Sequence, residues 1–154
     1  MKRSKIILMV ILSACIALQF IQPARNKNGQ VPANDFAKVY AVPVPVQTIL
    51  QNACYDCHSN NTRYPWYVHT QPMAWIMARH IKNGKAMLNF SEFGAYPTRR
   101  QASKLKDIAH TMQDNTMPLF SYTIMHKSAN LSPSDKKLLI DWMQAKSDSL
   151  VQLK

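Results

Sequence analysis

Two cysteines and a histidine within one short segment constrain this chain more than any other feature. Cys54, Cys57 and His58 form the pattern C-x-x-C-H. On a helical turn, two thiols at this spacing can each add to one vinyl group of a haem, and the adjacent imidazole can then bind the iron. The motif therefore predicts one covalent haem c, held by Cys54 and Cys57, with His58 as a ligand of the metal.

Three other uses of these cysteines remain open. A thioredoxin-like redox pair would need a surrounding βαβ pattern, which the sequence does not contain. A zinc site would need a second closely spaced pair of ligands, and none follows the motif. A disulfide between Cys54 and Cys57 would close a small ring and distort the helix. Haem attachment is favoured because it uses all three residues of the motif.

The N-terminus has the pattern of an export signal. Basic residues at positions 2, 3 and 5 precede an apolar run over residues 6–21. Such a run predicts an uncleaved signal anchor, a single transmembrane pass over residues 1–22. Since positive residues stay in the cytoplasm, the domain is expected in the periplasm, at the cytoplasmic membrane. The alternative is a lipoprotein lipidated at Cys15, because Leu12-Ser13-Ala14-Cys15 resembles a lipobox.

The composition limits the partners. Only three glycines occur, so a glycine-rich phosphate loop is excluded. The formal net charge is +11, but the basic residues are scattered along the chain. We therefore expect a solvated basic surface and no nucleic-acid partner. Such a surface can steer an acidic redox partner protein, and no small-molecule substrate is predicted.

The rest of the chain divides into a linker and a domain. Residues 23–45 include the alternation Val42-Pro43-Val44-Pro45, which favours extended polyproline geometry. This segment is predicted to be an extended linker. Residues 46–154 contain no convincing strand pattern, and they are predicted to form one haem-binding domain of the cytochrome c type.

Helical periodicity predicts about four short helices in that domain. The first begins near Pro45, and the second runs from Pro72 to Asn83 with Gly84 as its C-terminal stop. The third begins after Thr98, which has capping-box spacing to Gln101, and the fourth follows Ser132-Pro133, with Ser132 as its N-cap. The expected fold is all-α: a cytochrome c-like bundle with long loops around one haem, preceded by the membrane-anchor helix.

The second axial ligand is predicted to be Met117. Met117-Pro118 lies on an irregular segment before the last helix, as the thioether ligand does in small class I cytochromes c. An open sixth position, Met125 and a histidine remain alternatives. The histidines are His69, His80, His110 and His126. Five other methionines are expected to fill the core: Met73, Met77, Met87, Met112 and Met143.

The haem propionates need hydrogen-bond donors. Four residues soon after the motif could supply them: Arg63, Tyr64, Trp66 and Tyr67. Of these we select Arg63 and Trp66 as cofactor-binding candidates.

The assembled residues resemble a known family, the bacterial haem-binding domain family with a single C-x-x-C-H site. The similarity runs from about Val46 to Trp142 and is carried by several blocks. They are Cys54-Tyr55-Asp56-Cys57-His58-Ser59-Asn60, Thr62-Arg63-Tyr64-Pro65-Trp66-Tyr67, Asn89-Phe90-Ser91-Glu92-Phe93, Met117-Pro118, Tyr122, His126 and Leu131-Ser132. The resemblance implies a cytochrome c-like fold, haem binding and an N-terminal membrane anchor. One departure is Leu119, where the family usually has a second proline.

These inferences favour electron transfer over catalysis. A haem with both axial positions filled binds no substrate, so the protein is expected to be an electron carrier rather than an enzyme. Two alternatives remain. One is a peroxidase-like haem protein with a displaceable sixth ligand, for which His80 or His126 could act as acid or base. The other is a haem-based sensor module.

Overall fold

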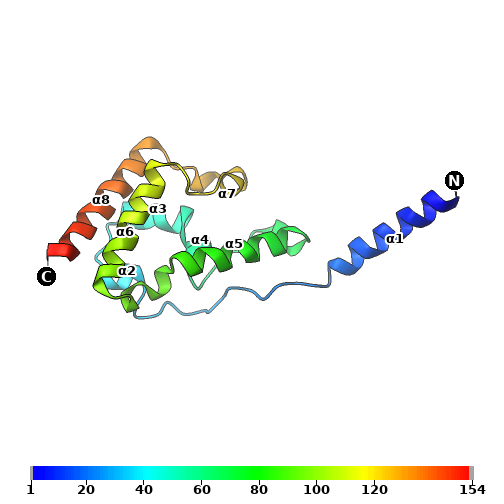
Figure 1. Cartoon of the computed structure of the whole chain (residues 1–154), viewed down its shortest axis with the longest axis horizontal. Coiled ribbons are helices and arrows are strands. Elements are labelled where there is room, and N and C mark those ends of the chain that lie inside the picture. The colour runs from blue at the N-terminus through cyan, green and yellow to red at the C-terminus, as the bar shows by residue number, and fades with distance from the viewer. Residues whose placement is uncertain (1, 153–154) are drawn as a thin grey trace.

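The computed structural model describes residues 2–152, and every regular element within them is helical (Figure 1). The α-helices are α1 (Lys2–Leu18), α2 (Phe36–Val39), α3 (Val44–Ala53), α4 (Tyr55–His58), α5 (Met73–Met87), α6 (Thr98–Gln113), α7 (Phe120–Met125) and α8 (Pro133–Gln152). The 3₁₀ helices are η1 (Trp66–His69), η2 (Phe90–Ala95) and η3 (Lys127–Ala129). The all-α prediction is confirmed. Residues 1, 153 and 154, at the ends of the predicted segments 1–22 and 46–154, lie outside the described part.

Helices α6 and α8 lie side by side and run antiparallel (Figure 1). Near one end of the pair, the Ser147 hydroxyl donates a hydrogen bond to the Ala102 carbonyl at 2.9 Å. The apolar stripe predicted for α6 is buried, as expected from its helical spacing. Its members are Ala102, Leu105, Ile108, Ala109 and Met112.

The start of α8 has the predicted cap. The Ser132 hydroxyl accepts a hydrogen bond from the Asp135 amide at 3.1 Å, and the Asp135 carboxylate accepts from the Ser132 amide at 3.2 Å. These reciprocal bonds form a capping box, which satisfies amides that the first helical turn leaves free. On α8, Leu139 and Met143 are buried, whereas Leu138 is 41% exposed.

Phe36 is the centre of the main core, and it comes from the segment predicted to be a linker. Its side chain is 0% exposed and makes edge-to-face contacts with the rings of Tyr40, Phe90, Phe93 and Trp142. The Asp35 carboxylate caps α2 by accepting from the Ala37 amide at 3.0 Å. The prediction that all of residues 23–45 form an extended linker is therefore wrong. Aromatic burial outweighs the local polyproline preference.

A second, smaller group of buried residues lies beside the main core. It consists of Val68, Met77 and Ile81, with Cys57 and Tyr122 packed against it. Helix α5 carries two of these residues, and it packs against the motif helix α4. The candidate site described below lies where these two groups meet.

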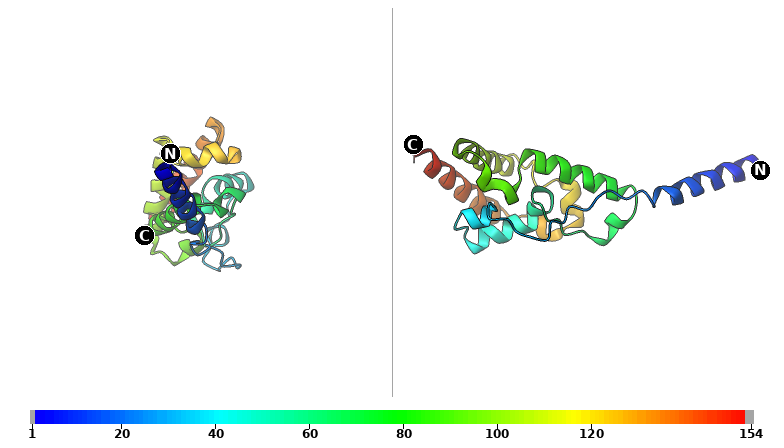
Figure 2. Two further views of the ribbon diagram at one scale, coloured as in Figure 1. Left: turned by 90° about the vertical axis from the view of Figure 1, so that its right-hand side faces the viewer. Right: turned by 90° about the horizontal axis from the view of Figure 1, so that it is seen from below.

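Helix α1 extends away from the other helices and buries none of its side chains (Figure 2). It is 17 residues long, and three of its first four residues are basic. Among residues 2–152, no helix combines the length and the apolar character that a membrane crossing needs. The predicted single-pass anchor over residues 1–22 is thus wrong, and with it the placement at the cytoplasmic membrane with the domain in the periplasm. Cys15, the residue considered for lipidation, is an exposed free thiol on α1.

Gly84 does not end the second predicted helix, because α5 continues to Met87. A Cβ atom at position 84 would come within 2.7 Å of the Cys57 carbonyl oxygen. Glycine is therefore required at this position because α5 approaches the backbone of α4 closely, and not because the chain turns.

We predict that Gly84→Ala destabilises the fold. Alanine normally stabilises an exposed helix interior relative to glycine, but here the added methyl forces α5 away from α4, at a net cost of about 1–3 kcal/mol. Urea denaturation of the purified chain measures this change. Lys82→Ala, at an exposed site on the same helix, should stay close to wild type. A Gly84→Ala chain as stable as wild type would contradict the close approach.

Candidate functional site

The motif residues lie at a break between two helices. Cys54 separates α3 from α4, with φ −126° and ψ −45°. Its carbonyl oxygen accepts hydrogen bonds from the amides of Cys57, at 3.2 Å, and His58, at 3.0 Å. This single turn brings both thiols and the imidazole to one wall of a cavity, and neither cysteine is in a disulfide.

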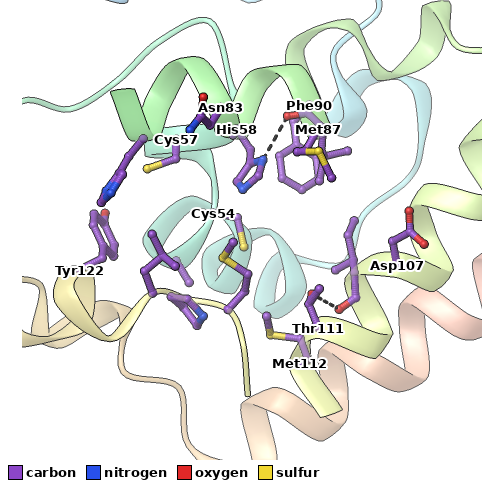
Figure 3. Close-up of a pocket in the computed structure, with 18 of the residues that line it drawn as sticks. Cys54, Cys57, His58, Asn83, Met87, Phe90, Asp107, Thr111, Met112 and Tyr122 are labelled. Carbon is purple, nitrogen blue, oxygen red and sulfur yellow. Dashed lines mark hydrogen bonds between the residues drawn. The ribbon is translucent and has the colours of Figure 1, made fainter. Parts of the chain in front are cut away.

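The cavity has a volume of about 600 Å³, within the usual range for small-molecule and cofactor sites. Cys54, Cys57 and His58 enter from one side, and Thr111 and Met112 face them from α6 (Figure 3). Most of the lining is apolar, including Met77, Leu88, Phe90, Ile108, Met117, Pro118 and Leu119. The cavity is thus a largely apolar space with one wall that carries two thiols and an imidazole.

One hydrogen bond orients the His58 ring. Its Nδ1 atom donates to the Leu88 carbonyl oxygen at 3.1 Å (Figure 3). This bond fixes the tautomer and leaves Nε2 with a free lone pair. Burial lowers the pKa of the imidazole, although the backbone carbonyls of Leu88 and Gly84 oppose this effect. A neutral imidazole with a free nitrogen is the form that binds a metal.

Burial keeps both motif thiols protonated. It raises the pKa of Cys54 to about 12, with a further contribution from the charge of Cys57. The pKa of Cys57 is raised to about 11, first by burial and then by the negative charge of Asp56. The two thiols of the chain without haem are therefore weak nucleophiles at neutral pH.

Met117 reaches the cavity because of the way α6 ends. Asn115 has a left-handed backbone with φ 54°. The Thr116 amide donates to the Thr111 carbonyl at 3.1 Å, and the Asn115 amide donates to the Met112 carbonyl at 3.4 Å. This pair of bonds is a Schellman motif, which ends the helix and reverses the chain. The reversal brings Met117 to the cavity.

The other ligand candidates are divided between the cavity and the surface. His80 and His110 line the cavity, but His110 is also paired with Asp114 at 2.8 Å. His69, His126 and Met125 do not line it. Among the methionines expected in the core, Met77, Met112 and Met143 are buried, whereas Met73 is 38% exposed and Met87 is 67% exposed. Met87 lines the cavity, as the buried Met77 and Met112 do, so three thioethers are present there besides that of Met117.

Arg63 and Trp66, chosen as propionate donors, do not line the cavity. The Arg63 guanidinium instead bonds the Asp56 carboxylate, with Nε at 3.1 Å from Oδ1. Trp66 is 80% exposed and stacks edge-on against Tyr67. Besides the motif residues, the polar side chains that line the cavity are Asn83, Lys104, Thr111, His80, His110, Tyr122 and Asp107. The role of Arg63 and Trp66 as propionate donors therefore stays a prediction, and the structure gives Arg63 a partner within the chain.

The residues present fit a haem. Two thiols and a metal-binding imidazole share one wall, a thioether comes from another segment, and the space between them is mainly apolar. A zinc site needs about four close ligands. Within residues 2–152, no three His, Cys, Asp or Glu side chains gather closely enough to hold an ion.

Comparison with known families gives one match. The model of the haem-binding domain family matches residues 13–145, which is most of the chain. No curated protein and no solved structure is significantly similar to the chain.

The thiol pKa values predict slow alkylation of the chain without haem. In a Cys15→Ser variant at pH 8, iodoacetamide should modify Cys57 about 100-fold more slowly than an ordinary cysteine, and Cys54 more slowly still. The rate should rise with pH as more thiolate forms. Peptide mass spectrometry measures each site, and the urea-unfolded chain is the control. Rates equal to those of the unfolded chain would contradict the burial of the thiols.

The Schellman motif predicts a ranking of variants at position 115. Asn115→Ala should lose about 1 kcal/mol of unfolding free energy, because alanine resists a left-handed backbone. Asn115→Gly should lose less, even though both variants remove the 2.5 Å hydrogen bond from the Lys136 ammonium. Chemical denaturation compares the two. Since both variants lack the side-chain bond, a glycine variant less stable than the alanine variant would contradict the requirement for a left-handed backbone at this position.

Proposed function

The chain belongs to the haem-binding domain family, and from this premise we propose that it attaches one haem covalently and transfers electrons. The observation that carries the proposal is the shared wall of the cavity, where Cys54, Cys57 and the free Nε2 of His58 meet.

Attachment would be an addition reaction at each cysteine. Each thiol adds its S–H across one vinyl double bond, so that a C–S bond forms, the hydrogen goes to the other vinyl carbon and no group leaves. The raised thiol pKa values favour a chain that stays unreactive toward other electrophiles until haem lies against it.

Two residues are proposed to hold the iron. His58 would bind it through Nε2, since its Nδ1 is held by Leu88. Met117 would supply the second contact, supported by its position in the cavity lining at the end of the α6 reversal. When bound, haem would supply one-electron redox chemistry, and one thioether and one imidazole ligand would raise its potential relative to two imidazoles.

The apolar cavity supports electron transfer rather than turnover of a substrate. An apolar surround excludes water and disfavours the extra charge of ferric iron. The proposed partner is an acidic redox protein, which the chain's net charge of +11 would attract. A peroxidase-like function remains the second candidate, because His80 lines the cavity, whereas His126, the other proposed acid or base, does not.

We predict that the chain, produced in a host that matures c-type cytochromes, gains the mass of one haem. Cys54→Ser and Cys57→Ser should each leave only one thioether bond, and the double variant should leave none. Denaturing mass spectrometry and extraction with acid and organic solvent measure the attachment. A colourless wild-type chain would end the proposal.

The optical spectrum tests the distal ligand. Wild type should be low-spin and unaffected by carbon monoxide, with a weak red charge-transfer band from the thioether. Met117→Ala should lose that band and bind the gas. Met125 lies outside the cavity, so Met125→Ala is the matched control. Met87→Ala tests whether the exposed Met87, which also lines the cavity, is the ligand instead. Survival of the band in Met117→Ala would remove Met117 from the site and turn attention to Met87.

A further inference from the structure

We propose that Asp56 and Tyr122 are positioning residues that hold the Met117 segment against the cavity. The inference rests on the proposed function, since it assigns these two side chains a role in keeping the distal ligand in place. Asp56 lies inside the motif, between the two cysteines, and Tyr122 lies on α7, five positions after Met117.

Asp56 is a buried carboxylate, and its side chain is 6% exposed. Its oxygens accept hydrogen bonds from the Arg63 amide at 3.1 Å, from Arg63 Nε at 3.1 Å and from the Tyr122 hydroxyl at 2.7 Å. Buried carboxylates are expensive unless they are bonded, so these donors stabilise the ionised group. Asp56 is therefore a junction between the motif helix, the loop after it and α7.

Tyr122 is the residue that joins α7 to this junction. Its side chain lines the cavity (Figure 3). Its hydroxyl makes the shortest of the hydrogen bonds to Asp56, at 2.7 Å. Burial, and then the hydrogen bond to Asp56, raise the pKa of the phenol above its ordinary value, so the hydroxyl remains a donor. Its ring also stacks on His126, with centroids 4.0 Å apart.

Helix α7 has little else to hold it. None of its six residues is buried, and Phe120 and Ile124 are 80% and 58% exposed. Segments with few buried contacts open easily and independently of the rest of a protein. The Tyr122 amide donates to the Leu119 carbonyl at 2.9 Å, so the start of α7 is continuous with the segment Met117–Leu119. Loosening α7 would therefore loosen the distal ligand.

The same carboxylate thus connects the two sides of the cavity. Through the backbone of α4 it is two residues from His58, and through Tyr122 it holds the segment that carries Met117. Neither side chain needs to touch iron for this role. Their effect would be to keep the thioether close enough to compete with external ligands.

Tyr122→Phe tests the connection, because it removes one hydroxyl and leaves the ring. Tyr64→Phe is the matched control, since the Tyr64 hydroxyl accepts an equally short bond, 2.7 Å, from the Asn26 amide and does not contact α7. In the chain without haem, hydrogen exchange should be roughly tenfold faster in Tyr122→Phe at the amides of Tyr122 and Thr123 in α7 and of His126, its C-cap. In Tyr64→Phe the exchange of these amides should match wild type.

The haem-loaded proteins give the second readout. Tyr122→Phe should bind carbon monoxide at least roughly tenfold faster than wild type and show a weaker thioether band, while Tyr64→Phe should not. Asp56→Asn should change the rate of gas binding and the thioether band in the same direction as Tyr122→Phe. It replaces Tyr122→Phe in the test if that variant does not fold. Faster exchange with unchanged gas binding, or no change in either, would overturn the inference. A wild-type chain that takes up no haem would instead refute the proposed function, and the exchange data would still show whether Tyr122 holds α7.

Discussion

The close packing of α5 on the motif helix is the contact on which the rest of the site depends. Gly84 allows the two backbones to approach, and α5 then continues for one more turn before it ends. At that end the Leu88 amide donates a hydrogen bond to the Gly84 carbonyl, and the Leu88 carbonyl accepts a hydrogen bond from His58 Nδ1. One tight helix contact therefore sets both the position of the cysteine wall and the orientation of the imidazole.

Local signals predicted the longer helices α3, α5, α6 and α8, but not the short helices α2, α4 and α7. The apolar stripe of α6 and the cap at Ser132 depend on spacing within a few residues, and both are present as expected. The grouping of Cys54, Cys57 and His58 at one wall of the cavity was also predictable, since three motif residues on one turn must lie close together. Met117 was predicted to be an iron ligand from the proline that follows it. The left-handed residue that ends α6 and brings Met117 to the cavity, Asn115, was not predicted.

What the sequence could not predict depends on contacts between distant segments. Arg63 was predicted to bind the haem because it follows the motif, but its bond to the buried carboxylate of Asp56 was not predicted. Phe36 lies in a stretch rich in proline and polar residues, and only the aromatic residues of η2 and α8 explain its burial. Gly84 has the expected identity for a helix end, but a close approach from another helix explains it better. In each case a tertiary contact outweighed a local preference.

The burial of Phe36 also sets the size of the smallest unit that can fold. A fragment beginning at residue 46, where sequence periodicity first predicts a helix, would lack the ring that four other aromatic residues surround. Such a fragment would keep the motif and every cavity-lining side chain, yet it would have a hole in its main core. The structural domain therefore begins upstream of its own haem-binding motif by some twenty residues.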